Sequence, residues 1–435
     1  MNYRAKPGSR TGSVSVPASK SYAHRLLIGF ALSRDGGRIE CEGISEDVKA
    51  TIECLKALGA EITISEDRYI EVKPADRPAG PADTVSAPVN LHCGESGSTL
   101  RFLLPVVGAL GAKATFHMEG RLPDRPFREL AEELAGHGMT IQRRDSTISC
   151  EGKLWSGDYT IPGNISSQYV TGLLMALPLL EGDSTLTVTG EIQSADYIAI
   201  TEDVLQSMKI AFHKEGSGES PVKYGIPGSQ TYKPQPFEAV ERDWSGAAFF
   251  ACMGALSDKG ITLRDMPAES VQGDRRILDI LKDFGAEITV SERDGADSGR
   301  DITVRRGHLE PQEIDVSQIP DILPEICIVA ACCEGTTTIT GAERLRFKES
   351  DRLKSMAGLL RELDVNVKET RTGLIINGTG KLTGGYGDPF GDHRIAMAAA
   401  VAATAATGDI TITDAECVAK SYPGFWEDFD RLEIE

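Results

Sequence analysis

An internal repeat constrains the fold more than any other feature of this chain of 435 residues. A glycine followed by a short run with the alternation of a β-strand recurs about every 75 residues. The six runs are Gly37–Cys41, Gly111–Phe116, Gly182–Val188, Gly260–Leu263, Gly335–Thr340 and Gly408–Thr413. Each run follows an Ala-rich segment that is apolar on nearly all sides, which predicts a buried helix. The six predicted helices are Ser21–Leu32, Ser98–Leu110, Ser167–Leu180, Ser245–Leu256, Ile322–Cys333 and Arg394–Ala406.

A second, amphipathic helix follows each glycine strand, and an alternating strand often comes next, as in Glu61–Ile64 and Glu287–Val290. Examples of these helices are Ile52–Leu58, Ile277–Phe284 and Leu353–Leu363. Such units are too large for a solenoid, and the chain is too long for one ordinary core. We therefore predict two globular halves of three units each, with buried helices inside and sheets outside. The Gly-, Ser- and Pro-rich stretch Gly216–Pro236 is predicted to cross between the halves.

Composition excludes several classes of protein. The net charge is -19 and no basic run occurs, which argues against a nucleic-acid binder. The longest apolar run, Ile395–Ala406, is too short to span a bilayer, and Met1–Arg10 has no apolar stretch typical of a signal peptide. The nine cysteines form no C-x-x-C pair and show no metal spacing with histidine. We expect free thiols, a cytoplasmic protein and no metal site.

Basic residues and hydroxyls gather where the buried helices are predicted to begin. The starts are Lys20, Ser21 and Arg25; Gly94–Arg101; Ser166, Ser167 and Gln168; Pro320 and Asp321; and Asp392–Arg394. Free backbone N–H groups and the helix dipole favour anions at such starts. If the helices converge at one end, they form a positive funnel for a multiply anionic substrate between the halves. Taken singly, a Ser or Asp here is most often an N-cap, and a first-turn Lys or Arg is usually solvated or ion-paired.

Three loops carry further basic clusters, in Arg121–Arg128, Arg344–Arg352 and Val418–Pro423. The segment Lys348–Arg352 is equally well interpreted as a salt-bridged helix start. The pair Gly94 and Gly97 lacks the third glycine of a dinucleotide fingerprint.

Several of these motifs together resemble those of the EPSP synthases (3-phosphoshikimate 1-carboxyvinyltransferases). Pro17–Ser21 with Arg25 looks like the opening motif of that family, and Gly94–Arg101 resembles its phosphoenolpyruvate loop. The remaining matching motifs follow in family order: Ser166–Gln168, Ser194 with Tyr197, Gln272–Asp274, Ile319–Asp321, Lys348–Arg352, Asp392–Arg394 and Lys420. The resemblance extends over nearly the whole chain, and the combination is far more specific than any one motif.

The resemblance implies a fold, namely two inside-out α/β domains of three repeated units, each with buried parallel helices and outer sheets. One domain comprises residues 1–18 and 236–435, the other residues 19–235, and the active site lies in the cleft between them. It further implies transfer of the enolpyruvyl group of phosphoenolpyruvate to the 5-hydroxyl of shikimate 3-phosphate, in the pathway to chorismate and the aromatic amino acids. No metal or organic cofactor, membrane or nucleic acid is implied, and a monomer is expected.

The resemblance also assigns ligand contacts, position by position. The residues implied to hold phosphoenolpyruvate are Lys20, Gly97, Arg125, Gln168, Arg352, Arg394 and Lys420. Those implied to hold shikimate 3-phosphate are Lys20, Ser21, Arg25, Ser166, Ser167, Gln168, Ser194, Tyr197, Asp321 and Lys348. The implied catalytic residues are Lys20, Asp321 and Glu349, with Glu349 exchanging the carbon proton, Asp321 assisting the hydroxyl, and Lys20 shuttling a proton and stabilising the leaving phosphate.

Two positions depart from the commoner family pattern. Glu95 and Arg344 stand where many members have asparagine, and neither is predicted to contact a ligand. An acid such as Glu95 is unfavourable near an anion unless it is paired or turned away.

Two other functions remain as alternatives. The first is enolpyruvyl transfer to UDP-N-acetylglucosamine, whose enzymes usually carry a reactive cysteine in a loop where Lys113–Arg128 has none. The second is a non-catalytic anion-binding relative, which we would expect to have lost Lys20, Asp321, Glu349 or Arg394.

Overall fold

The computed structural model describes residues 1–75, 88–216, 221–292 and 299–434. The chain divides into two compact units, each described by itself below. Unit 1 comprises Met1–Ser19 with Glu241–Glu435, and unit 2 comprises Lys20–Val240. Across the described ranges, every helix is too short or too polar to cross a membrane.

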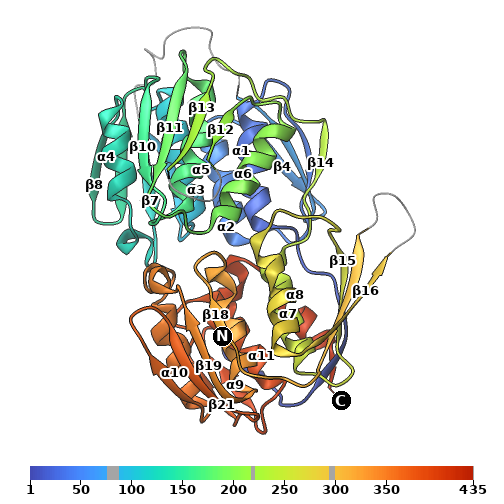
Figure 1. Cartoon of the computed structure of the whole chain (residues 1–435). Helices are drawn as coiled ribbons and strands as arrows, with labels where there is room; N and C mark the ends of the chain where they lie inside the picture. Colours follow the sequence, from blue (N-terminus) through green and yellow to red (C-terminus); the bar gives the residue numbers. More distant parts are fainter. Residues whose placement is uncertain (76–87, 217–220, 293–298, 435) are drawn as a thin grey trace. The chain divides into compact units, whose positions relative to one another are not determined.

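Unit 2 contains three four-stranded sheets with the same topology (Figure 1). In each sheet the first strand runs parallel to the second, and two further strands are antiparallel. The first sheet has the order β14 (Phe237–Ala239), β3 (Gly37–Glu40), β5 (Tyr69–Lys73), β4 (Glu61–Ser65). The second has the order β6 (Val89–Gly94), β7 (Ala114–Met118), β9 (Thr147–Glu151), β8 (Thr140–Arg144). The third has the order β10 (Asp158–Pro162), β11 (Ser184–Thr189), β13 (Val222–Ile226), β12 (His213–Glu215).

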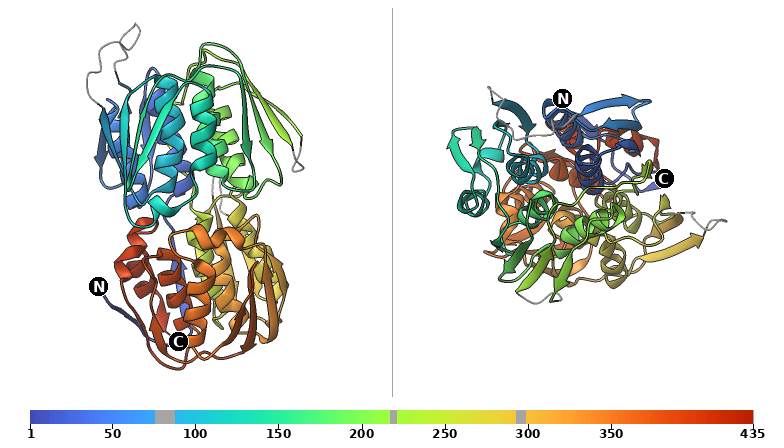
Figure 2. Two further views of the ribbon diagram at one scale, coloured as in Figure 1. Left: turned by 90° about the vertical axis from the view of Figure 1, so that its left-hand side faces the viewer. Right: turned by 90° about the horizontal axis from the view of Figure 1, so that it is seen from above.

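The helices that precede the second strand of each sheet are buried almost from end to end. They are α1 (Lys20–Leu32), α3 (Gly97–Leu110) and α5 (Ser167–Ala176). Apolar residues surround each of them, so they lie inside their unit with the strands outside, as the left view of Figure 2 shows. The outer helices are α2 (Glu46–Ala57), α4 (Arg128–Gly136) and α6 (Ala195–Ser207), with short 3₁₀ turns η1 (Leu122–Asp124) and η2 (Leu177–Leu179).

Unit 1 repeats this plan with variations at its edges. One sheet has the order β18 (Glu313–Asp315), β19 (Glu334–Thr340), β21 (Leu374–Thr379), β20 (Asn366–Glu369). A five-stranded sheet has the order β16 (Glu287–Glu292), β17 (Arg300–Arg305), β15 (Ile261–Met266), β2 (Arg10–Val14), β24 (Glu433–Ile434). A three-stranded sheet has the order β1 (Tyr3–Ala5), β23 (Ile410–Ile412), β22 (Gly385–Gly387).

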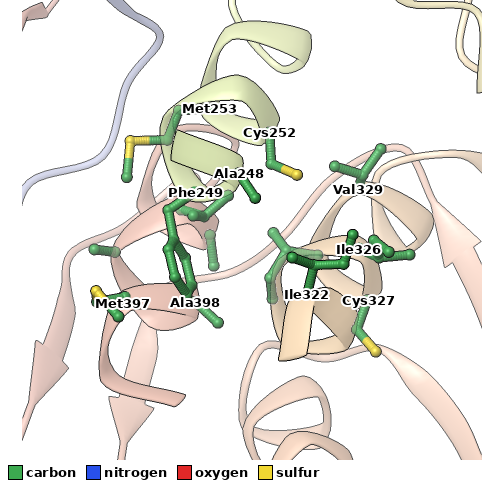
Figure 3. Packing of buried hydrophobic residues seen from close by; sticks show 14 of the residues in the cluster. Ala248, Phe249, Cys252, Met253, Ile322, Ile326, Cys327, Val329, Met397 and Ala398 are labelled. Carbon is green, nitrogen blue, oxygen red and sulfur yellow. The ribbon is translucent and has the colours of Figure 1, made fainter. Parts of the chain in front are cut away.

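Three buried helices form the core of unit 1: α7 (Trp244–Ala255), α9 (Leu323–Ala331) and α11 (His393–Ala403). Their apolar side chains interlock, and Figure 3 shows Phe249 of α7, Ile326 of α9 and Ala398 of α11 in this cluster. The remaining helices are α8 (Ile277–Phe284), α10 (Arg352–Glu362) and α12 (Phe425–Arg431). Short 3₁₀ turns are η3 (Gly273–Arg276), η4 (Pro320–Ile322), η5 (Glu343–Phe347) and η6 (Ala415–Lys420).

Each unit includes one strand from a segment next to the point where the chain passes between the units. β2, near the N-terminus, pairs in parallel with β15 of unit 1, whereas β14 pairs in parallel with β3 of unit 2. In both cases this strand supplies the parallel neighbour of the glycine strand, β15 or β3. The stretch Gly216–Pro236, which the sequence predicts to be the crossover, contains β13, and this strand pairs with β11 and β12. Hydrogen bonding of that strand keeps it in unit 2, and the chain enters unit 1 after Val240.

The predicted fold class is confirmed, with small shifts at the ends of helices. The third helix, for example, ends at Ala176 and continues as the turn η2, because Pro178 cannot continue an α-helical ladder. All nine cysteines lie in the described ranges, and none of them forms a disulfide.

Candidate active site

Gly97, at the start of α3, brings two guanidinium groups of unit 2 together. A Cβ atom at this position would lie 2.5 Å from Nη1 of Arg101 and 2.9 Å from Nη1 of Arg125. The Arg101 side chain is buried and donates to Oε1 of Gln168 at 3.0 Å and to the carbonyl of Pro126 at 2.7 Å. Two guanidinium groups beside a helix N-terminus suit a small ligand with carboxylate and phosphate groups.

A chain of buried hydroxyls supports the same helix start. His24 Nδ1 lies 2.7 Å from Thr51 Oγ1, which lies 2.7 Å from Thr99 Oγ1. Thr99 in turn donates to Oγ of Ser96, the N-cap of α3, at 2.7 Å. Burial lowers the pKa of His24 to about 3, so the imidazole is neutral. The network thus fixes the Gly94–Ser98 loop without placing a charge beneath it.

Lys20, the first residue of α1, is held by a carboxylate from α2. Its Nζ lies 3.0 Å from Asp47 Oδ2, with the two side chains 20% and 8% exposed. The backbone carbonyl of Asp47 lies 3.4 Å from the Thr99 hydroxyl, within the hydroxyl chain. The ammonium group is therefore tied to the same part of unit 2 as the Gly94–Ser98 loop.

Arg25 lies one turn further along α1 and is fully enclosed. It donates to the carbonyls of Ser21 at 2.6 Å and Tyr197 at 2.8 Å, and to the hydroxyls of Thr201 at 2.8 Å and Thr171 at 3.1 Å. Burial lowers its pKa to about 9. These contacts fix a cation where α1, α5 and α6 meet.

Serines mark the starts of α5 and α6. Ser166 caps α5 by accepting from the backbone N–H of Gln168 at 3.3 Å, and Ser167 is buried beside it. Ser194, before α6, has a left-handed backbone with φ of 57°, which is uncommon outside glycine. Such a conformation often accompanies a functional site, because the surroundings must hold it in place.

Arg352 is the centre of the corresponding cluster in unit 1. Its side chain is 2% exposed and contacts three carboxylates, namely Asp392 at 2.8 Å, Asp321 at 2.7 Å and Glu349 at 2.8 Å. Burial opposes the charge of Arg352, but the attraction of Asp392, Glu349 and Asp321 outweighs it and raises the pKa of the guanidinium. The guanidinium therefore keeps its positive charge although it is buried.

Two further cations contact Asp321. Lys348 Nζ lies 3.2 Å from Asp321 Oδ1, and Arg394 donates to the Asp321 carbonyl at 2.8 Å. Arg394 also donates to the Ser245 hydroxyl at 2.6 Å, which connects α7, α9 and α11 at their starts.

Asp392 caps α11 and organises the base of this cluster. Its Oδ1 accepts from the backbone N–H of Arg394 at 3.0 Å, and its Oδ2 accepts from the Ser350 hydroxyl at 3.0 Å. Burial alone would raise the pKa of Asp392, but Arg352 lowers it below its usual range. Lys420 lies at the end of η6, which packs on α11, and is 9% exposed.

Comparison with known proteins decides the family. The model of EPSP synthase (3-phosphoshikimate 1-carboxyvinyltransferase) matches residues 5–429. This chain belongs to the EPSP synthase family. The 3-phosphoshikimate 1-carboxyvinyltransferase of Clostridium kluyveri is 41% identical over 428 residues, covering 98% of this chain and 96% of the relative. That of Clostridium beijerinckii is 39% identical over 435 residues, covering 99% and 97%. A structure of EPSP synthase from Acinetobacter baumannii has a TM-score of 0.77 and 27% identity, covering 100% of this chain and 99% of that one.

The residues assigned from the EPSP synthase motifs lie in two groups. In unit 2 the contacts above connect Gly97 with Arg125, and Arg25 with the backbone of Ser21 and Tyr197. In unit 1 they connect Asp321, Lys348, Glu349, Arg352 and Arg394. Contact with the two substrates stays a prediction for every residue in both groups.

Three residues of the clusters were given no role by the sequence. Arg101 was visible as a first-turn basic residue, but only its contact with Gln168 shows that it positions that amide. Asp392 was visible within the Asp392–Arg394 motif, yet an N-cap and an ion-pair acceptor look alike in sequence. Asp47 carried no signal, since its pairing with Lys20 depends on the packing of α2 against α1.

The two positions that depart from the family pattern are turned to neighbouring backbone. A Cβ atom at Gly120, which has φ of 52°, would lie 1.4 Å from Glu95 Oε1. The Glu95 carboxylate therefore lies over Gly120, in the loop that follows β7 and leads to Arg125. Arg344 donates to the carbonyl of Ser317 at 3.2 Å.

Proposed function

We propose that this chain transfers the enolpyruvyl group of phosphoenolpyruvate to the 5-hydroxyl of shikimate 3-phosphate. The products are 5-enolpyruvylshikimate 3-phosphate and inorganic phosphate, on the route to chorismate and the aromatic amino acids. The observation that carries this proposal is the family match over residues 5–429. The buried cation clusters support it, because two anionic substrates must be held together against their mutual repulsion.

The proposed reaction has two steps. First, the 5-oxygen of the acceptor bonds to C2 of phosphoenolpyruvate while C3 gains a proton and the hydroxyl loses one. The resulting tetrahedral adduct then loses a proton from C3 as its C2–O bond to phosphate breaks, and the C2–C3 double bond forms again. No electrons are gained or lost overall, so the chain need supply only proton transfer, positioning and charge.

The phosphoenolpyruvate contacts are proposed from both units. Unit 2 contributes Gly97, Arg125 and Gln168. Unit 1 contributes Arg352 and Arg394. Lys20 and Lys420 complete this set. Because Arg guanidinium groups bind carboxylate and phosphate with paired hydrogen bonds, they fix the orientation of the donor as well as its charge.

The shikimate 3-phosphate contacts are proposed around Arg25 and the starts of α5 and α6. The set is Lys20, Ser21, Arg25, Ser166, Ser167, Gln168, Ser194 and Tyr197, with Asp321 and Lys348 from unit 1. Helix starts that carry serine present hydroxyl and N–H groups that suit a phosphate ester and ring hydroxyls.

Glu349, Asp321 and Lys20 are proposed to transfer protons. Glu349 is held at 2.8 Å by Arg352 and exchanges the proton at C3. Asp321 lies between Lys348 and Arg352 and assists the 5-hydroxyl. Lys20 shuttles a proton and stabilises the leaving phosphate. Carboxylates also stabilise the positive charge that develops at C2.

We propose that residues 1–18 with 236–435 and residues 19–235 act as two domains with the active site between them, and that binding draws both onto the substrates. Small-angle scattering with and without shikimate 3-phosphate tests this arrangement. Compaction on saturation is expected, and an unchanged profile contradicts it. We further propose a cytoplasmic monomer that uses no metal or organic cofactor, for which light scattering and activity after extensive chelation are the checks.

A phosphate-release assay tests the function itself. Release is expected with phosphoenolpyruvate plus shikimate 3-phosphate, and not when UDP-N-acetylglucosamine replaces the acceptor. Lys348→Ala should lower the rate, whereas Lys354→Ala, at an exposed position of α10, should not. Phosphate release with phosphoenolpyruvate and UDP-N-acetylglucosamine, but not with shikimate 3-phosphate, would favour enolpyruvyl transfer to the sugar nucleotide. Binding of the substrates without phosphate release would favour a non-catalytic relative.

A further inference from the structure

Glu325 is a buried acid to which the proposed function gives no role. It lies in the first turn of α9, one turn after Asp321, and is 0% exposed. Neither of its carboxyl oxygens accepts a hydrogen bond from another residue in the described parts of the chain. An ionised carboxylate is costly in such a place, because it loses water without gaining donors.

Two of the groups around Glu325, Arg394 and Arg352, belong to the set of residues proposed to hold phosphoenolpyruvate. Asp321 lies in the turn η4, which leads directly into the first turn of α9. The Asp321 carbonyl accepts from Arg394 at 2.8 Å, which places that guanidinium at the start of α9. The charged and titratable groups that act on Glu325 are Arg394 of α11, Arg352 of α10, Asp274 of η3, Cys252 of α7 and Cys327 of α9 itself.

These surroundings favour the neutral acid at physiological pH. Burial raises the pKa of Glu325 to about 8, and Asp274 adds to that effect, while Arg394 and Arg352 oppose it. Arg352 is already contacted by three carboxylates, so Arg394 is the cation that an ionised Glu325 would draw upon most directly.

We propose that Glu325 is a positioning residue that acts through Arg394. It remains protonated while phosphoenolpyruvate binds, and so maintains the affinity of the Arg394 guanidinium for this anionic donor. This inference depends on the proposed function, in which Arg394 contacts phosphoenolpyruvate. When Glu325 is neutral, it does not attract the positive charge of Arg394, and that charge can interact with the ligand. An ionised Glu325 competes with the ligand for that charge, so donor affinity falls as the pH rises past the ionisation of this group. By linkage, the bound donor also favours the protonated acid.

The test is the KM for phosphoenolpyruvate at saturating shikimate 3-phosphate, measured from pH 7 to pH 9.5. The enzymes compared are the wild type, Glu325→Gln, Glu325→Met and the control Glu313→Gln, which changes an exposed acid of β18. The ratio of the wild-type KM to that of Glu325→Gln is expected to rise about tenfold over this range, as an added charge next to Arg394 implies. Ionisation of the substrate cancels in that ratio, and Glu313→Gln should follow the wild type.

A purely structural role for Glu325 predicts a different result. The variants would then lose activity or stability by a factor that does not change with pH, and a constant KM ratio overturns the proposal. Glu325→Met replaces the acid with an apolar side chain, so it repeats the test if a buried amide impairs folding. If neither variant folds, a wild-type KM that stays flat from pH 7 to pH 9.5 overturns it. Absence of wild-type turnover would instead contradict the proposed function.

Discussion

Nε of Arg352 donates to Asp392 Oδ2 at 2.8 Å, which connects the first residue of α10 to the N-cap of α11 deep inside unit 1. The Arg352 side chain is 2% exposed and the Asp392 side chain is 0% exposed. Because Arg352 also holds Asp321 and Glu349, one buried cation maintains the positions of three carboxylates. Both the folding stability of unit 1 and the placement of the proposed catalytic carboxylates Asp321 and Glu349 therefore depend on Arg352.

Replacement of Arg352 should affect stability as well as turnover. Arg352→Ala leaves three carboxylates without their shared cation, and we expect a loss of about 3–5 kcal/mol in the free energy of unfolding. Arg352→Lys keeps the charge but cannot reach three acceptors, so an intermediate loss is expected. Urea unfolding measures both, with Arg371→Ala at an exposed position as the control. Equal stability of Arg352→Ala and the wild type would show that the cluster carries little folding energy.

Glu349→Gln should block proton exchange at C3 of phosphoenolpyruvate. The amide cannot take up the proton, and we expect kcat to fall by about 10²–10⁴. The direct measurement is deuterium incorporation at C3 in D₂O, followed by NMR in the presence of shikimate 3-phosphate. Glu362→Gln, which alters an exposed acid in the last turn of α10, is the matched control. Unchanged exchange in Glu349→Gln removes this residue from proton transfer.

Gly97→Ala tests the packing of the two guanidinium groups against α3. The added methyl would lie 2.5 Å from Arg101 and 2.9 Å from Arg125, so at least one side chain must move. We expect the KM for phosphoenolpyruvate to rise about tenfold, since a displaced guanidinium loses roughly one charged hydrogen bond. The KM for shikimate 3-phosphate should change much less.

Gly136→Ala is the control for that substitution. It is also a helical glycine of unit 2, but its added methyl meets no atom within 4 Å. Unchanged kinetics are expected, with a small gain in stability from the better helix former. If Gly97→Ala behaves like Gly136→Ala, the guanidinium groups are not constrained at that position.

The sequence predicted the repeats well, because glycine strands and apolar helices are local patterns. The buried helices follow from apolar residues on all sides, as in α7 and α11. The pairing of β2 with β15 and of β14 with β3 could not be predicted from these residues, since three- and five-residue strands carry no register information.

The candidate site was predicted from motifs rather than from geometry. Lys348 and Arg352 were recognised, but their shared partner Asp321 lies about 30 residues away and is brought to them only by the packing of α9 and α10. Glu325 was not singled out, because an acid in a first helical turn ordinarily stabilises the helix dipole and gives no sign of its burial.

Buried Glu325 should also make the free energy of unfolding depend on pH in the absence of substrate, and Glu325→Gln should remove this dependence. The pKa of Glu325 is raised by burial from 4.5 to about 8, so between these values the folded protein keeps a proton that the unfolded chain releases. The contribution of Glu325 to the free energy of unfolding of the wild type therefore falls as the pH rises from 4.5 to about 8. Gln carries no proton to lose, so its stability relative to the wild type should rise by up to about 1.4 kcal/mol per pH unit. Urea unfolding at several pH values within this window measures the difference, and Glu313→Gln should show no such trend. The difference in free energy of unfolding between Glu325→Gln and the wild type could instead be independent of pH. Glu325 would then already be ionised in the folded protein, and its carboxylate would be a permanent counter-charge to Arg394.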